Sequence, residues 1–269
     1  MIPNALRLYF RYVGLSVRAQ MQYRASFIML TLGQVMLTCI EFIGIWTLFK
    51  RFGSLKGWRL SEVALFYGMI SIAFAIAEGV ARGFDTFPNM VKSGDFDRLL
   101  LRPRSTAFQV AAQELQMPRI GRFLQAAVVL AWAAATLGVQ WTMWRVGLLV
   151  FAVAGGVCLF YVLFVLSAIT AFWTTETLEI FATVTYGGNE TGQYPLSIYW
   201  PNFRKFFTFV VPLACVAYFP ALAVLGRTDE AIGSPLWFQC SAPAVGVAFM
   251  AVMLWLWRVG VKHYQSTGS

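Results

Sequence analysis

Six long apolar stretches alternate with shorter polar segments along the chain. They lie at about 25–49, 61–81, 123–139, 146–172, 206–225 and 244–257. A helix of roughly 20 apolar residues is long enough to cross the hydrocarbon core of a bilayer. The pattern therefore predicts an all-α polytopic membrane protein with six transmembrane helices, which form a single transmembrane domain over residues 1–269.

The composition supports a membrane protein. Hydrophobic residues make up 59% of the 269 residues and charged residues only 12%, about half the charged fraction of soluble domains. The net charge of +9 has an ordinary origin, because Lys and Arg gather in the cytoplasmic loops of membrane proteins. Most bases here flank apolar stretches and do not form a soluble basic face, so we expect no nucleic-acid partner.

A helix of a different kind is predicted for residues 4–24. Arg7, Arg11 and Arg18 fall close to one face at 3.6 residues per turn, and apolar and aromatic residues fill the opposite side. Such an amphipathic helix lies in the headgroup region, with its bases toward anionic lipid. We therefore expect an interfacial helix before the first span.

The longest polar region is 82–122, and its charge is concentrated in Gly94–Ser105. The charged residues there are Asp95, Asp97, Arg98, Arg102 and Arg104. They surround three consecutive leucines, and Pro103 ends the turn because proline cannot donate to a helix ladder. An ordinary positive loop would explain the arginines, but not the acids or the leucines. The pattern favours contact with a soluble partner.

Two acids and two prolines interrupt the predicted spans. Glu41 lies in the first span and Glu78 near the end of the second. A charged side chain in hydrocarbon costs about 3 kcal/mol, so both should face protein or a water-filled cavity. A structural role between helices and a role in a transport pathway both fit. Pro212 and Pro220 break the fifth span, and kinked spans often line pathways.

The orientation follows from the basic residues. With six spans, both termini lie on the same side as 82–122, and more than twice as many Lys and Arg fall there as on the other side. The positive-inside rule then places both termini on the cytoplasmic side of the membrane. We expect this membrane to be the cell (inner or plasma) membrane. Four bases in 50–60 argue mildly against this orientation.

Gly187–Pro195 is a loop by composition, and we expect it on the cytoplasmic side.

The chain has few residues for catalysis. Its four cysteines show no CxxC spacing, and its one histidine is His263 near the tail, so no metal site or disulfide framework is predicted. Gly187 and Gly192 have the spacing of a phosphate loop, but Gln193 stands where the lysine is needed. We expect no catalytic, cofactor-binding or metal site, and energy for transport must come from a partner or an ion gradient.

Short motifs follow one another along nearly the whole chain. They are Tyr23-Arg24, Gly94–Asp97, Leu100–Pro103, Phe172-Trp173, Tyr194–Leu196, Tyr199–Pro201, Pro212, Tyr218–Ala221, Trp257–Gly260 and Tyr264–Gly268. Together they resemble the permease subunit of a type-2 ABC exporter, in a subgroup formerly described only as a domain of unknown function.

The resemblance implies six spans, an N-terminal interfacial helix and a cytoplasmic coupling helix between spans two and three. It implies a second permease subunit (the same or a sister chain) and two cytoplasmic ATP-binding subunits, which carry the ATP and Mg. The docking element falls within 84–104. Its candidate contact residues are Phe84, Phe87, Asp95, Phe96, Asp97, Arg98, Arg102 and Pro103.

We therefore predict a non-catalytic permease subunit that moves a substrate with ATP hydrolysed by a separate chain. In this hypothesis the candidate pathway residues are Glu41, Glu78, Pro212 and Pro220. The alternative is a secondary transporter or channel without an ATPase, in which Glu41 and Glu78 handle an ion. A membrane enzyme is the weakest hypothesis, because no catalytic constellation is present. The sequence does not identify the substrate.

Overall fold

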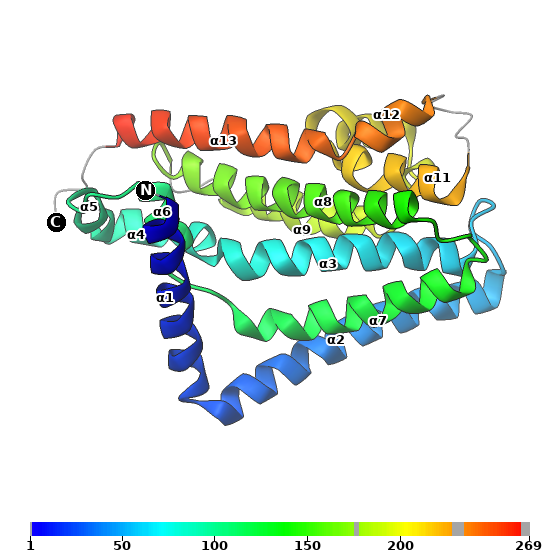
Figure 1. Cartoon of the computed structure of the whole chain (residues 1–269), viewed down its shortest axis with the longest axis horizontal. Coiled ribbons are helices and arrows are strands. Elements are labelled where there is room, and N and C mark those ends of the chain that lie inside the picture. The colour runs from blue at the N-terminus through cyan, green and yellow to red at the C-terminus, as the bar shows by residue number, and fades with distance from the viewer. Residues whose placement is uncertain (1, 175–177, 228–233, 265–269) are drawn as a thin grey trace.

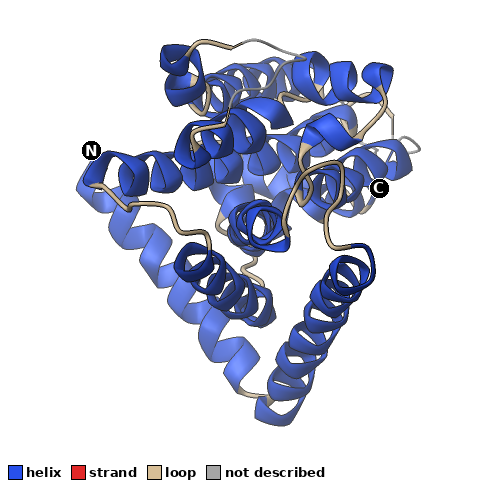
Figure 2. Ribbon diagram, turned by 90° about the vertical axis from the view of Figure 1, so that its right-hand side faces the viewer, coloured by secondary structure: helices blue, strands red, loops and turns tan. Residues whose placement is uncertain are grey.

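The computed structural model describes residues 2–174, 178–227 and 234–264. Its regular structure is helical (Figure 2), apart from one isolated bridge between Leu55 and Trp58. The prediction of an all-α protein is confirmed. The last five residues of the chain, which include most of the Tyr264–Gly268 motif, lie outside the described residues.

Within the described ranges, seven helices have fifteen or more residues: α1 (Ile2–Met21), α2 (Arg24–Phe52), α3 (Leu60–Asp85), α7 (Ile120–Thr136), α8 (Met143–Thr170), α9 (Leu178–Gly192) and α13 (Ala244–His263). Shorter α-helices are α4 (Phe87–Lys92), α5 (Asp95–Leu100), α6 (Thr106–Ala111), α10 (Pro201–Lys205), α11 (Phe219–Leu225) and α12 (Leu236–Ser241). Single 3₁₀ turns lie at Met117–Arg119 and Leu196–Ile198, and π-helical turns at Phe206–Val210 and Ala214–Tyr218.

Four of the described helices, α2, α3, α8 and α13, are long and apolar enough to cross a membrane, judged by length and composition alone. The number rises to five if the bent pair Pro201–Val210 and Ala214–Leu225 counts as one span. The protein is therefore a multi-pass helical membrane protein. The predicted third span falls on α7, which has 17 residues.

Helix α3 forms the centre of the bundle, with α7 and α8 packed along it. Its apolar residues are buried nearly all the way round, as expected for a helix without a polar face. Helix α2 is the opposite case, because large apolar side chains such as Leu32, Met36 and Ile40 are more than half exposed. That surface requires lipid or another protein to cover it.

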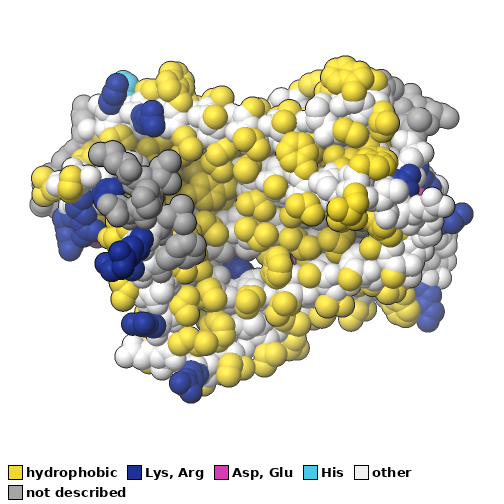
Figure 3. Space-filling model, viewed as in Figure 1, with side chains coloured by type: hydrophobic (Ala, Val, Ile, Leu, Met, Phe, Trp, Pro, Cys, Tyr) yellow, Lys and Arg dark blue, Asp and Glu magenta, His cyan; other side chains and the backbone are white. Residues whose placement is uncertain are grey.

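The bundle has two distinct ends (Figure 1). Both termini lie at one end with α4, α5 and α6, and the loop between α2 and α3 lies at the other. Lys and Arg gather toward these ends, and a broad apolar band separates them on the face shown in Figure 3. Helix α1 crosses the bundle axis at the terminal end (Figure 1), as a helix in the headgroup region would. Tyr9 of α1 packs on Phe108 of α6, where burial raises the pKa of the phenol.

Helix α9 replaces part of a predicted loop. Its chain follows α3 in the opposite direction: Tyr186 donates from its hydroxyl to Glu78 Oε1 at 3.3 Å, and Ser197, just beyond α9, accepts from Trp58 Nε1 at 3.0 Å. The chain thus passes from the level of Glu78 to the end where α3 begins. The loop prediction is wrong over Gly187–Gly192, where the chain is helical and buries the side chains of Asn189 and Thr191.

The predicted break in the span at 206–225 is a sharp bend. Its residues form two helical arms bent by 86°, because Pro212 interrupts the hydrogen-bond ladder beside an extended Val211 (φ −111°, ψ 97°). Pro220 causes no break, since it occupies the first turn of α11, where proline is tolerated.

The bent pair begins and ends at the same end of the bundle. Just before the first arm, the Ile198 carbonyl accepts from Lys56 Nζ at 3.0 Å. Just after the second arm, Arg227 Nη2 donates to the Gly57 carbonyl at 3.1 Å. Lys56 and Gly57 belong to the short loop between α2 and α3, so the bent pair enters the bundle and returns to the same side.

Candidate functional site

The two intramembrane acids predicted from the sequence lie in one buried ion-pair network. Glu41 comes from α2 and Glu78 from α3, while Arg119 and Arg122 stand at the start of α7. Glu78 is the most enclosed, with 5% of its side chain exposed, and Arg122 has 11% exposed. The network therefore joins three helices across the interior of the bundle.

The distances rank the members. Arg119 Nη2 lies 2.9 Å from Glu78 Oε1. Arg122 bridges the two acids, 3.9 Å from Glu78 Oε2 and 3.7 Å from Glu41 Oε1. Its guanidinium also lies 5.2 Å from the centre of the Phe74 ring, a favourable position for a cation over an aromatic face. The four charges sum to zero, so the network carries no net charge into the apolar band.

Neutral side chains complete the site. Arg119 donates from Nη1 to Gln34 Oε1 at 2.7 Å and from Nε to Gln116 Oε1 at 3.0 Å. Tyr186 of α9 donates to Glu78, which brings a fourth helix to the same carboxylate. Buried charges need partners of this kind, because an isolated charge in hydrocarbon is costly.

A glycine allows the helices of the network to approach. A Cβ on Gly121 would lie 2.7 Å from the carbonyl oxygen of Thr31 on α2, so a larger residue would push α2 and α7 apart. Because Arg119 and Arg122 flank Gly121, this contact sets how far their guanidinium groups stand from Glu41. Sequence reasoning placed both arginines in the cytoplasmic loop and missed their pairing.

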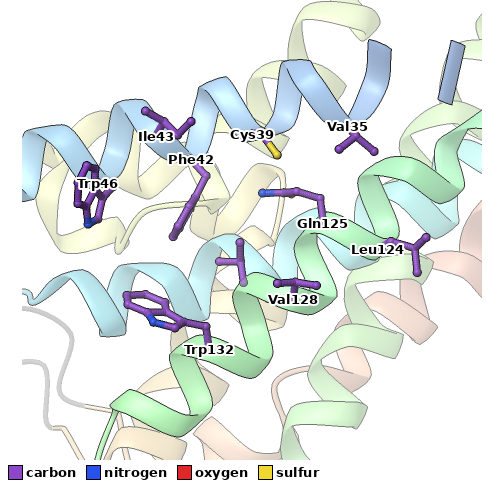
Figure 4. A pocket seen from close by; sticks show the side chains of 10 residues that line it. Val35, Cys39, Phe42, Ile43, Trp46, Leu124, Gln125, Val128 and Trp132 are labelled. Atoms are coloured by element: carbon purple, nitrogen blue, oxygen red, sulfur yellow. The ribbon is translucent and has the colours of Figure 1, made fainter. Parts of the chain in front are cut away.

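An apolar groove of about 730 Å³ lies beside the network, between α2 and α7. Figure 4 shows side chains of both helices facing each other across it, with Trp46 and Trp132 toward one end. Gln125 is the polar side chain in this view. It accepts from the Tyr67 hydroxyl at 3.3 Å, which fixes it on the floor of the groove.

The predicted docking element has a buried half and an exposed half. Phe84, Phe87 and Phe96 are at most 1% exposed. Phe87 and Phe96 lie 5.0 Å apart, ring centre to ring centre, and contact Trp257 of α13 and Phe172 just after α8. These three phenylalanines therefore anchor the element to the bundle and are not on its surface.

The tip of the element is formed by residues 98–105 and is exposed except for Leu99. Leu101 is 87% exposed and Leu100 41%, while Arg102 and Pro103 lie beside them on the surface. Gln109 Nε2 donates to the carbonyls of Leu99 and Arg104, which ties both sides of the tip to α6. Leu100 and Leu101 thus present adjoining apolar surface on a turn whose position is fixed.

The charges near the tip differ in their pairing. Asp95 pairs with Arg98 at 3.0 Å and accepts from the Ser93 hydroxyl at 2.7 Å. Gly94 adopts a left-handed conformation (φ 74°) at the turn before them, which favours glycine. Asp97 of the same helix is half-buried. For Arg102 the part of the chain that the structure describes contains no ion-pair partner.

The fold and these sites define a multi-pass helical membrane protein with a neutral ion-pair network inside and a structured, exposed tip at its terminal end. A family model described as "ABC-2 family transporter protein" matches residues 12–268, and the chain belongs to that family. No curated protein and no solved structure matches the chain. The resemblance seen in the motifs is confirmed over nearly the whole length.

Membership settles the broad function. The chain is a membrane permease of an ABC transporter, and the family implies partnership with an ATP-binding subunit in a transporter complex. The family's membrane subunit is normally non-catalytic.

Proposed function

We propose that the chain is the non-catalytic permease of an exporter driven by ATP, which a separate cytoplasmic subunit binds with Mg and hydrolyses. The complex contains two ATP-binding subunits and a second permease, either another copy of this chain or a sister chain. One observation carries the proposal: the exposed tip at 98–105 is fastened to the bundle core through buried aromatic rings. Such a tip can receive a force from a soluble partner.

The tip faces the cytoplasm in this proposal. It lies at the same end as both termini and most of α1 (Figure 1), and this end carries many of the Lys and Arg residues in Figure 3. By the positive-inside rule, this end lies on the cytoplasmic side of the cell membrane. Helices α2, α3, α7, α8, α9 and α13 supply six crossings, and the bent pair 201–225 enters from the opposite side.

The aromatic contacts define a mechanical path. Phe87 and Phe96 both contact Phe172 at the end of α8. Phe87 also contacts Trp257 in α13. Trp257 also donates from Nε1 to Thr106 Oγ1 at 3.0 Å, which links α13 to α6. A displacement of the tip therefore reaches α3, α8 and α13 together. Packed elements of this kind switch between discrete arrangements.

The contact with the ATP-binding subunit is made by Leu101 with Arg102 and Pro103 around it. Asp95, Asp97 and Arg98 lie at the rim, where the Asp95–Arg98 pair stiffens the turn. Phe84, Phe87 and Phe96 act from inside the bundle by holding the turn in place. Tight interfaces often centre on an apolar anchor with charged residues around it.

The ion-pair network belongs to the pathway in this proposal. Glu41 is 33% exposed beside the α2–α7 groove, whereas Glu78 is almost fully enclosed. A change in the angle between α2 and α7 would lengthen the contact of Arg122 with Glu41 first, since that contact is already 3.7 Å. The network then holds one packing of the helices, and Pro212 and Pro220 shape the bent pair that closes the opposite side.

The test places a charge at the tip and, as a matched control, at the other end of the molecule. Leu101→Glu and Met143→Glu both alter exposed apolar residues, at 87% and 91% exposure. We expect Leu101→Glu to lower ATP hydrolysis stimulated by the permease at least about tenfold, because a charge replaces the apolar anchor. Met143→Glu should leave it unchanged.

An equal effect of the two variants would refute the contact at the tip. Robust transport by the purified chain without any ATP-binding subunit would instead favour a secondary transporter. The pairing of Glu41 and Glu78 with arginines weighs against that second function, because paired acids are less available to carry an ion.

A further inference from the structure

A cavity lies in the inner angle between α1 and α2. Its volume is about 660 Å³, and its third wall is the segment 113–119 that leads into α7. A second hollow of about 310 Å³ adjoins it and shares Gln20, Leu30 and Pro118 with it. In Figure 1, α1 lies across the terminal end while α2 runs along the bundle. The angle therefore sits where the apolar band meets the charged end.

The lining of this elbow cavity is mixed in a way that matches its position. Leu15 of α1 and Leu30 of α2 line it and are 61% and 59% exposed. Amides and charges line it as well, from Gln34, Gln113, Glu114, Gln116 and Arg119. A molecule that fills the cavity must cover aliphatic side chains and also satisfy polar groups, which is the property of a membrane amphiphile.

The walls are fixed to one another by hydrogen bonds. The backbone N–H of Leu115 donates to Ser16 Oγ at 3.3 Å, and that of Met117 donates to Gln20 Oε1 at 3.2 Å. Gln20 also donates through Nε2 to the Leu115 carbonyl. Helix α1 is thus fastened to the start of α7, and the cavity between them has a set shape.

The two charged residues of the lining have opposite signs. Arg119 is 27% exposed, and its contacts with Glu78, Gln34 and Gln116 leave N–H donors for a further acceptor. Glu114 is 49% exposed and lies 3.7 Å from Arg82, too far for a close hydrogen bond. A ligand with one anionic and one cationic group would satisfy both residues.

We propose that the elbow cavity binds a zwitterionic phospholipid of the surrounding leaflet as a resident molecule. Its phosphate lies against Arg119 and the glutamine amides, and its ammonium group lies against Glu114. An acyl chain covers Leu15 and Leu30. An anionic headgroup fits less well, because it offers the Glu114 carboxylate no cation. The proposal does not depend on the docking tip or on ATP, so its test is separate from that of the proposed function.

The experiment is native mass spectrometry of the full chain in a non-ionic detergent, with added phosphatidylethanolamine or phosphatidylglycerol of identical acyl chains. We expect one phosphatidylethanolamine bound per chain, at least about tenfold tighter than phosphatidylglycerol. Leu30→Trp should fill the cavity and lower the occupancy about tenfold. Leu48→Trp is the control, because Leu48 lies on the same helix, is also exposed and does not line the cavity.

Glu114→Gln tests the headgroup. This change should remove the preference for phosphatidylethanolamine over phosphatidylglycerol, because it removes the partner of the ammonium group. The proposal is overturned if the unmodified chain binds both lipids equally, or if Leu30→Trp and Leu48→Trp have the same effect. Equal thermal unfolding temperatures for the two tryptophan variants would show that a folding defect is not the cause.

Discussion

Glu78 shows how one residue couples several helices. It is enclosed among α3, α7 and α9 and has contacts with Arg119, Arg122 and Tyr186. The sequence alone could predict that Glu78 faces protein, because a lone charge in lipid is costly. It could not predict these partners, because they lie 41, 44 and 108 positions from Glu78 along the chain. Only the packing of α7 and α9 against α3 brings them together.

The first prediction concerns this enclosure. Glu78→Gln removes the enclosed carboxylate that pairs with Arg119 and with the nearly buried Arg122, so we expect a loss of about 3 kcal/mol in the free energy of unfolding. For a chain of this size that corresponds to roughly 6–12 °C in the unfolding temperature, measured in detergent. Glu114→Gln is the control, since an exposed pair contributes about 1 kcal/mol or less. Similar losses from both variants would mean that the Glu78 network does not stabilise the fold.

The phenylalanines of the docking element differ from the expectation. Phe84, Phe87 and Phe96 were predicted to contact a partner, and the structure places them inward, with Phe87 against Phe172 just after α8 and Trp257 of α13. The sequence could not tell an inward face from an outward one, because both are apolar when a partner is expected. Leu101 is the exposed apolar residue, and the signal for it was its place just before Arg102 and Pro103.

At the scale of elements, long apolar stretches were predicted well and polar ones were not. The stretches on α2, α3, α8 and α13 have the length and composition of spans. Helix α9 was missed because it buries polar residues such as Thr185 and Asn189, each 2% exposed. The rule that glycine and polar residues mark a loop fails where other helices cover them. The bend at Pro212 was expected, but its size, 86°, depends on tertiary contacts.

The second prediction concerns the bent pair 201–225, which either returns to the side it came from or crosses the membrane. Chemical labelling separates these two topologies. Single cysteines replace Asn202 and Ser105 in a chain whose four native cysteines are changed to alanine. If the bent pair returns to the side it came from, a membrane-impermeant thiol reagent should label Asn202→Cys in intact cells. Ser105→Cys should react with the same reagent only after the membrane is permeabilised. Labelling of both positions under the same condition would instead indicate that the bent pair crosses the membrane as one broken span.

At the scale of the whole molecule, the account joins an exposed tip, a rigid aromatic anchor and a neutral charge network. The tip lies at one end, the bent pair closes the other, and α3 runs between them through the core (Figure 1). Composition predicted the membrane, and the family match confirms a transporter. The surface of α2 needs lipid or another protein to cover it, because several of its large apolar side chains are more than half exposed.

The central claim is that this chain works with ATP-binding subunits that dock at the tip. The most direct measurement is the subunit composition of the complex purified from its native membrane through a tag on this chain. The account predicts two ATP-binding subunits for two permeases, and their loss from the complex with Leu101→Glu but not with Met143→Glu. A purified, transport-competent assembly that contains no ATP-binding subunit would contradict it.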